Sequence, residues 1–144
     1  MIAVDTNILV HAHRADSEWH EPAHACIKRL AEGTSAWAIP WPCLHELLAI
    51  VTHPRIYDPP TPLAQAIDQV EAWLESPSLV LLSEDGAYWE QLKESLLQGR
   101  VRGAKVHDAR VAALSTAAGA SLLWTADRDF SVFGSLKTTN PLLG

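Results

Sequence analysis

The sequence lacks the long apolar runs, the basic N-terminal region and the closely spaced cysteines that mark membrane, exported and disulfide-rich proteins. None of the apolar runs in its 144 residues is long enough to span a bilayer. The first run is cut at Asp5 and no basic residue precedes it, which argues against a secretory signal. Cys26 and Cys43 stand alone, so we expect reduced thiols that serve in packing. These absences predict a cytoplasmic protein that does not bind membranes.

Zinc-enzyme motifs are also missing. The seven histidines form no H-E-x-x-H motif and no cluster with cysteine, so His20 and His24, four residues apart, are interpreted as a solvated face. There is no internal repeat and no low-complexity segment. A composition of 48% hydrophobic and 19% charged residues is typical of a chain with a full core. The length fits a single domain, predicted to cover residues 1–144.

What the sequence does contain is a regular alternation of strand and helix patterns. Short apolar runs predict strands at 2–4, 37–39, 79–82 and 122–124, with a fifth candidate at 136–138. Helical patterns follow at about 8–10, 22–33, 42–53, 63–74, 87–97 and 106–118. Because strands and helices alternate, we predict a three-layer α/β/α sandwich around a mostly parallel sheet of four or five strands. The fully apolar run at 79–82 is expected to be a central strand, and the proline-rich segment 53–62 a stiff surface loop.

Four acidic residues stand out because of where they lie in this pattern. Asp5 and Asp127 follow the first and fourth strands, at the strand ends where ligands bind in open α/β sheets. Asp108 lies in the first turns of its helix, and Glu46 lies about 200° around its helix from Leu44, away from the leucine stripe. If both helices begin near the same sheet edge, the four carboxylates converge there.

Converging carboxylates repel one another, and their pKa values rise unless a cation compensates them. Mg²⁺ or Mn²⁺ suits a site of carboxylates, waters and a substrate phosphate. Such an ion activates a water for attack on a phosphodiester and stabilises the leaving oxygen. The pattern therefore indicates a metal-dependent phosphoryl enzyme, although surface carboxylates are common in any acidic chain.

The motifs resemble those of PIN-domain nucleases. The resemblance rests on Asp5-Thr6-Asn7 after the N-terminal strand, Glu46, His107-Asp108-Ala109, and the run from Thr125 to Phe130, in that order. The short single-domain chain is similar to VapC-type toxins of type II toxin–antitoxin pairs. The resemblance implies an Mg²⁺- or Mn²⁺-dependent endoribonuclease that cleaves RNA phosphodiesters, forms a homodimer and is neutralised by a cognate antitoxin.

The resemblance also assigns residue roles. It implies that Asp5, Glu46, Asp108 and Asp127 bind the metal and are catalytic. Asn7 and Thr125 are candidates to orient carboxylates or the attacking water, and local turn chemistry explains them equally well. Asp129 is interpreted as auxiliary or structural, because either it or Asp127 could cap the following turn. The role of His107 is left open.

The net charge of −6 argues superficially against nucleic-acid binding. Leaving out the four proposed ligands changes it to −2, and bound cations would neutralise those four. Four basic residues lie around Asp108 and are predicted either to steer RNA phosphates or to form an ordinary solvated loop; they are Arg100, Arg102, Lys105 and Arg110.

The tryptophans divide into two predicted groups. Trp73, Trp89 and Trp124 lie in apolar patterns and are expected in the core. Trp19 and Trp41, near helix beginnings, are expected at the core edge or in a contact with a dimer partner or antitoxin.

Two other functions remain open. A non-catalytic RNA-binding or regulatory module could keep the same fold, although all four acids are present. An aspartyl-nucleophile phosphatase also places an aspartate after its first strand. Such enzymes usually carry a second aspartate two residues later, where this chain has Asn7.

Overall fold

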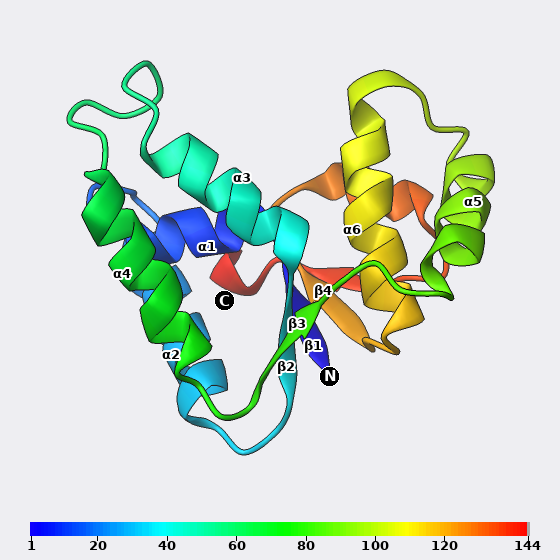
Figure 1. The fold of residues 1–144 in the computed structure, drawn as a ribbon, viewed down its shortest axis with the longest axis horizontal. Helices are drawn as coiled ribbons and strands as arrows, with labels where there is room; N and C mark the ends of the chain where they lie inside the picture. Colours follow the sequence, from blue (N-terminus) through cyan, green and yellow to red (C-terminus); the bar gives the residue numbers. More distant parts are fainter. Residues whose placement is uncertain (144) are drawn as a thin grey trace.

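Five short parallel strands form one sheet in the computed structural model, which describes residues 1–143 (Figure 1). The strands are β1 (Ile2–Val4), β2 (Trp37–Pro40), β3 (Leu79–Leu82), β4 (Leu122–Trp124) and β5 (Thr138–Thr139). Their order across the sheet is β3-β2-β1-β4-β5, and each neighbouring pair is parallel. The predicted α/β fold with a parallel central sheet is therefore confirmed.

In the described part of the chain, six α-helices connect the strands and cover the sheet. They are α1 (Thr6–His13), α2 (His20–Glu32), α3 (Trp41–Val51), α4 (Leu63–Leu74), α5 (Tyr88–Gln98) and α6 (Val106–Ala117). Short 3₁₀ turns follow at η1 (Gly103–Lys105), η2 (Arg128–Val132) and η3 (Pro141–Leu143). Figure 1 shows α1 to α4 gathered on one side of the sheet and α5 with α6 on the other. Within residues 1–143 none of the helices combines the length and apolarity needed to cross a bilayer.

The strand order creates a switch point beside β1. The chain moves outward from β1 through β2 to β3, and then returns across the sheet to place β4 on the other side of β1. At such a point the connections diverge to opposite faces, and a crevice opens at the carboxyl ends of the two central strands. Asp5 and Asp127 follow β1 and β4, so both lie at this crevice.

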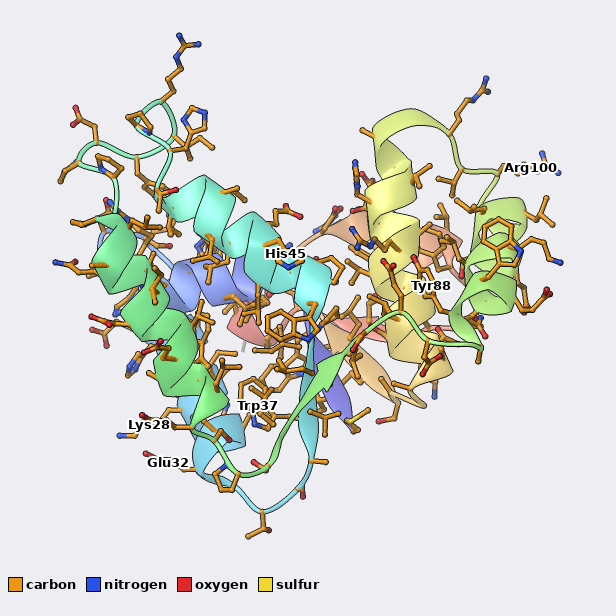
Figure 2. All side chains as sticks on the ribbon, in the orientation of Figure 1. Lys28, Glu32, Trp37, His45, Tyr88 and Arg100 are labelled. Carbon is orange, nitrogen blue, oxygen red and sulfur yellow. The ribbon has the colours of Figure 1, made fainter. Side chains whose placement is uncertain are left out.

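The apolar residues of the strands and helices form the core of the protein. Ala3, Ile39 and Leu123, from the three central strands, are completely buried, as expected for strands covered on both faces. Trp37 opens β2, lies buried in the core (Figure 2), and its indole N–H donates to Ser76 Oγ at 3.1 Å. The predicted stripe on α3 is also confirmed, with Leu44, Leu47 and Val51 buried and Leu48 partly buried.

Three predictions about apolar segments were wrong or shifted. Strand β3 lies at the sheet edge and not at its centre, and Val80 is 41% exposed. An apolar run shows that a strand packs well but does not show which strands flank it. Trp89, predicted in the core, is 57% exposed, because α5 packs through Leu92 and Leu96 instead. The fifth strand covers 138–139, slightly beyond the predicted 136–138.

The other tryptophan predictions were confirmed. Trp73 is buried, and Trp124 is partly buried against the core. Trp19 and Trp41 are partly buried against the same core, as expected for residues at its edge.

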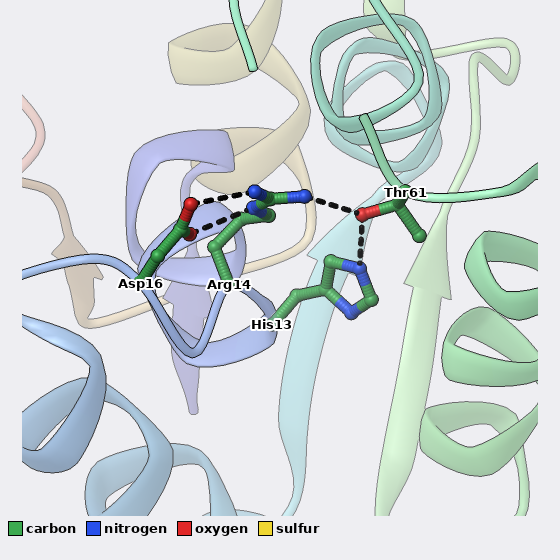
Figure 3. Close-up of polar contacts among 4 residues, drawn as sticks. All are labelled: His13, Arg14, Asp16 and Thr61. Carbon is green, nitrogen blue, oxygen red and sulfur yellow. Dashed lines mark hydrogen bonds and ion pairs between the residues drawn. The ribbon is translucent and has the colours of Figure 1, made fainter. Parts of the chain in front are cut away.

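The proline-rich segment is a loop, as predicted, and a polar cluster attaches it to the end of α1 (Figure 3). Arg14, which caps α1, donates to both oxygens of Asp16 at 2.9 and 2.6 Å and to Thr61 Oγ1 at 3.1 Å. His13 Nε2 lies 3.0 Å from the same hydroxyl. The Arg14 guanidinium also lies 4.2 Å from the centre of the Tyr57 ring. We call His13, Arg14, Asp16 and Thr61 the Arg14 cluster.

Candidate active site

Asp5 is buried at the carboxyl end of β1 and caps α1. Its Oδ1 accepts the backbone N–H of Thr6 at 2.8 Å, and its own backbone N–H donates to the carbonyl of Trp124 at 2.9 Å. The first bond satisfies one of the free N–H groups at the helix start and places the anion at the positive end of the helix dipole. The position of Asp5 is therefore fixed by both β4 and α1.

Thr125 links the ends of β1 and β4. Its hydroxyl donates to Asp5 Oδ2 at 2.8 Å and accepts the backbone N–H of Asp127 at 3.0 Å. Asn7 completes this link, because its Nδ2 lies 3.3 Å from Asp5 Oδ2 and 3.2 Å from Thr125 Oγ1, while its Oδ1 accepts the N–H of Ala126 at 3.0 Å. The two residues predicted to orient carboxylates are thus placed where they can do so.

All four predicted acids line one small cavity of about 120 Å³, which we call the acid cavity. Asp5 comes from the β1 end, Asp127 from the β4 end, Glu46 from α3 and Asp108 from α6. The complete lining is Asp5, Thr6, Asn7, Glu46, Ile50, His107, Asp108, Val111 and Asp127. The predicted convergence of the four carboxylates is therefore what the fold produces.

Burial and the neighbouring carboxylates make the charged forms of Asp5 and Asp108 unfavourable in the protein alone. Burial, followed by the carboxylates of Asp127 and Asp5, raises the pKa of Asp108, and Lys105 opposes the rise. Burial is also the largest cause of the raised pKa of Asp5; the hydrogen bonds from Thr125 and Thr6 oppose it and the charge of Glu46 adds to it. A cation bound among these carboxylates would relieve this repulsion.

The donors at the cavity fit a hard divalent cation that keeps part of its water shell. Among residues 1–143 no three His, Cys, Asp or Glu side chains are close enough together to ligate one ion at the same time. Mg²⁺ typically uses one or two carboxylates together with waters and substrate phosphate, so carboxylates facing a small polar cavity suit it. Thr6 Oγ1, also from the cavity lining, is buried without a hydrogen-bond partner among the described residues.

The two aspartates at the start of η2 have separate roles. Asp127 caps this turn by accepting the N–H of Asp129 at 2.8 Å and also lines the acid cavity. Asp129 is exposed, and its Oδ2 lies 3.7 Å from Lys105 Nζ. Of the two candidates for the cavity, the structure therefore places Asp127 there.

The predicted basic group is only partly at the site. Arg110 lines a larger groove next to the acid cavity and pairs with Glu84 at 2.6 Å. Arg100 and Arg102 are exposed and line neither space; Figure 2 shows Arg100 beyond the end of α5. Closeness in sequence to Asp108 does not bring these two residues to it, because the chain turns at η1 before α6 begins.

Sequence reasoning missed two neighbours of the site. Cys43, treated only as a packing residue, is buried with its Sγ 3.7 Å from Asp5 Oδ1, and burial raises the pKa of its thiol well above the ordinary value. His45, next to Glu46, lines the larger groove. The spacing along α3 was a signal for His45, since it lies one turn after Pro42 on the same face.

Comparisons with known proteins agree with this geometry. The PIN domain family model matches residues 2–136. The chain is 31% identical over 144 residues to ribonuclease VapC43 of Mycobacterium tuberculosis, covering 100% of this chain and 97% of the relative. It is 28% identical over 140 residues to ribonuclease VapC48 of the same organism, covering 97% of each.

Solved structures show the same fold. VapBC2 from Rickettsia felis, solved bound to a DNA fragment from their promoter, contains a chain that aligns with a TM-score of 0.67 at 21% identity. The alignment covers 96% of this chain and 98% of that one.

Proposed function

Because the chain belongs to the PIN-domain family, and within it to the VapC group, we propose that it is a metal-dependent endoribonuclease and the toxin of a type II toxin–antitoxin pair. The observation that carries this proposal is the acid cavity, where four carboxylates from four separate elements meet at the switch point of the sheet. Mg²⁺ or Mn²⁺ is the proposed cofactor. A purely structural role would not gather four carboxylates, two of which, Asp5 and Asp108, have raised pKa values.

In the proposed reaction the ion would bind among Asp5, Glu46, Asp108 and Asp127, with one or two of these carboxylates as direct ligands and the others holding its water molecules. When bound, the ion supplies a water-derived nucleophile at neutral pH and stabilises negative charge on the phosphate. Thr125 and Asn7 keep the Asp5 carboxylate oriented through their hydrogen bonds. We propose that Arg110, which lines the larger groove, and Lys105, whose charge acts on Asp108, meet RNA phosphates near the cavity, while Arg100 and Arg102 would act on more distant parts of the RNA.

The proposed partners are RNA, a cognate antitoxin and a second copy of the chain. The structural neighbour VapBC2 from Rickettsia felis supports a protein partner for this chain, because its name covers VapB as well as VapC. Helix α4 offers a surface for protein contacts, because Leu63 is 63% exposed and Ile67 and Leu74 are also exposed along it. An apolar row of this kind on a surface helix is typical of protein–protein contact sites.

The two alternative functions receive less support from the geometry. Asp5 Oδ2 is occupied by hydrogen bonds from Thr125 and Asn7, so it is poorly placed to act as the nucleophile of a phosphatase. A non-catalytic module would have no need for the repulsion among the acids.

The test is RNA cleavage by the purified chain with Mg²⁺ or Mn²⁺ and with excess chelator. We expect cleavage only with the cation, and a loss of at least about a hundredfold in Asp5→Asn, because the substitution removes a ligand charge. Asp68→Asn, an exposed aspartate on α4, is the matched control and should cleave normally. Cleavage that persists in chelator, or in Asp5→Asn, would overturn the metal mechanism.

A further inference from the structure

A larger groove continues outward from the acid cavity between α3 and α6. Its volume is about 530 Å³, within the range of about 300–1,000 Å³ that ligand sites occupy. The two spaces share Glu46, His107, Asp108 and Val111, so a ligand in the groove touches the same carboxylates that face the acid cavity. We call this space the α3–α6 groove.

The two walls of the groove carry matching stripes. On α3 the lining residues are Pro42, His45, Glu46 and Ala49, and on η1 and α6 they include Ala104, His107, Asp108 and Val111. Both sets follow the spacing i, i+3, i+4, i+7. This puts the first set on one face of α3 and puts His107, Asp108 and Val111 on one face of α6, with Ala104 just before it in η1. Each wall therefore offers a small or apolar residue, an imidazole, an acid and a second apolar residue. A flat, partly apolar ligand suits such walls.

The imidazole of His45 has a defined position. Its ring stacks on the indole of Trp41, with ring centres 6.1 Å apart and planes inclined by 30°. His45 is exposed on α3 (Figure 2), so its ring is held by Trp41 while remaining accessible in the groove. Nucleobases stack on aromatic and histidine rings in single-stranded RNA recognition.

The groove also contains a cation with a replaceable partner. Arg110 lines the groove, and its Nε and Nη2 lie 2.7 and 2.6 Å from one oxygen of Glu84. Both side chains are partly exposed to solvent, so this ion pair contributes little stability. A phosphate could replace Glu84, because arginine binds phosphate at least as readily as carboxylate.

We propose that the α3–α6 groove binds one unstacked nucleotide of single-stranded RNA beside the phosphate that is cut. Its base stacks on the His45 ring, and a backbone phosphate takes the place of Glu84 at Arg110. This inference rests on the proposed ribonuclease function. A duplex would not fit in this way, since its bases are already paired and stacked.

The test is binding of a labelled single-stranded RNA oligonucleotide to the full chain in chelator, measured by fluorescence anisotropy over a series of salt concentrations. His45→Ala should weaken binding about tenfold, the loss of one base stack, without changing the salt dependence. His45→Phe should restore it, because a phenyl ring also stacks. His24→Ala, an exposed histidine on α2 outside the groove, should bind normally.

The arginine is tested by the same measurement. Arg110→Ala should reduce the slope of log K against log salt by about 0.7, the effect of one phosphate contact on a single strand. Glu84→Gln should tighten binding by a factor of about two to three, since it frees Arg110.

Three results would each overturn the inference: normal RNA binding by His45→Ala, weak RNA binding by His45→Phe, or no RNA binding by the unaltered chain. The proposed function is judged separately by cleavage with Mg²⁺. If cleavage requires Asp5 but RNA affinity does not depend on His45, only the proposal for the α3–α6 groove is rejected. If RNA binds through His45 but is not cleaved, only the proposed ribonuclease function is rejected.

Discussion

The two ends of α1 hold polar clusters of opposite character. Asp5 caps the N-terminal end and faces the acid cavity, whereas Arg14 caps the C-terminal end and belongs to the Arg14 cluster. Each charge has the sign that the adjacent end of the helix dipole favours. A single eight-residue helix thus connects a candidate active site with a polar network that holds the proline-rich loop in place.

The difference between the two ends is charge balance. At the Arg14 cluster the guanidinium faces a carboxylate, a hydroxyl and an aromatic ring, and it lowers the pKa of Asp16 through a hydrogen bond and through its charge. At the acid cavity the neighbours of Asp108 are mostly other carboxylates, and its pKa is raised. Balanced charge identifies a contact that holds the fold together, and unbalanced charge identifies a site arranged for a ligand.

The largest difference between the two ends of α1 should come from Thr125→Val, which alters the acid cavity and should reduce RNA cleavage. Valine has nearly the same shape but cannot donate to Asp5 or accept from the N–H of Asp127. Losing a residue that orients metal-binding carboxylates typically reduces activity by about 10–100-fold, so we expect RNA cleavage to fall by that factor. Thermal unfolding should show a smaller loss, about 1–2 kcal/mol, from the partly buried N–H of Asp127 left unpaired.

Thr125→Ser is the control, because it keeps the hydroxyl and should retain most of the cleavage. Cleavage by Thr125→Val at the normal rate would show that the hydroxyl does not position Asp5 for the reaction.

Much of the acid cavity could be predicted from the sequence, but little of the Arg14 cluster could. The placement of Asp5 and Asp127 followed from strand patterns alone, because strand ends in a parallel sheet meet at one edge. Glu46 followed from its angle relative to the leucine stripe. The Arg14 cluster joins residues 47 positions apart, Arg14 and Thr61, through a loop whose path no local pattern specifies.

Errors in the predictions have the same origin. The run at 79–82 does form a strand, yet its position at the sheet edge depends on the order in which strands pair. Trp89 is apolar and helical, yet α5 turns it toward solvent. A related limit applies to Arg100 and Arg102, which are near Asp108 in sequence but line neither cavity, so their contact with RNA stays a prediction. Local periodicity identifies elements and faces, whereas neighbours across the sheet and the paths of loops depend on tertiary structure.

A second prediction concerns the Arg14 cluster, at the end of α1 where the charges are balanced. Arg14→Ala should lower the free energy of unfolding by about 2 kcal/mol, because it removes the hydrogen bond to Thr61 and the contact with Tyr57 as well as the ion pair. Cleavage per folded molecule should not change, since Arg14 is outside the acid cavity. Urea unfolding followed by tryptophan fluorescence measures the first quantity.

Lys93→Ala provides the matched comparison, because Lys93 forms only an exposed ion pair with Glu90 at 3.0 Å. That pair should contribute less than about 0.5 kcal/mol. Equal losses in the two variants would show that Arg14 also acts only as a surface ion pair.

The smallest effects should have opposite signs at the two ends of α1 and should appear in chelator as shifts of the melting temperature with pH. Asp108 has a raised pKa in the folded chain, so its charge opposes folding at neutral pH, and this penalty disappears as the pH falls below the unfolded value of about 3.9. Asp108→Asn should therefore raise the melting temperature at pH 7 by up to about 3 °C, with the gain vanishing near pH 3.

Asp16 has a lowered pKa, so its charge favours folding above about pH 3.9 and the contribution is lost as the pH falls through its folded value. Asp16→Asn should consequently lower the melting temperature at pH 7 and approach the unaltered chain in acid. A lower melting temperature for Asp108→Asn at pH 7 would place Asp108 with Asp16 among the stabilising carboxylates and remove the physical reason for a cation at the acid cavity.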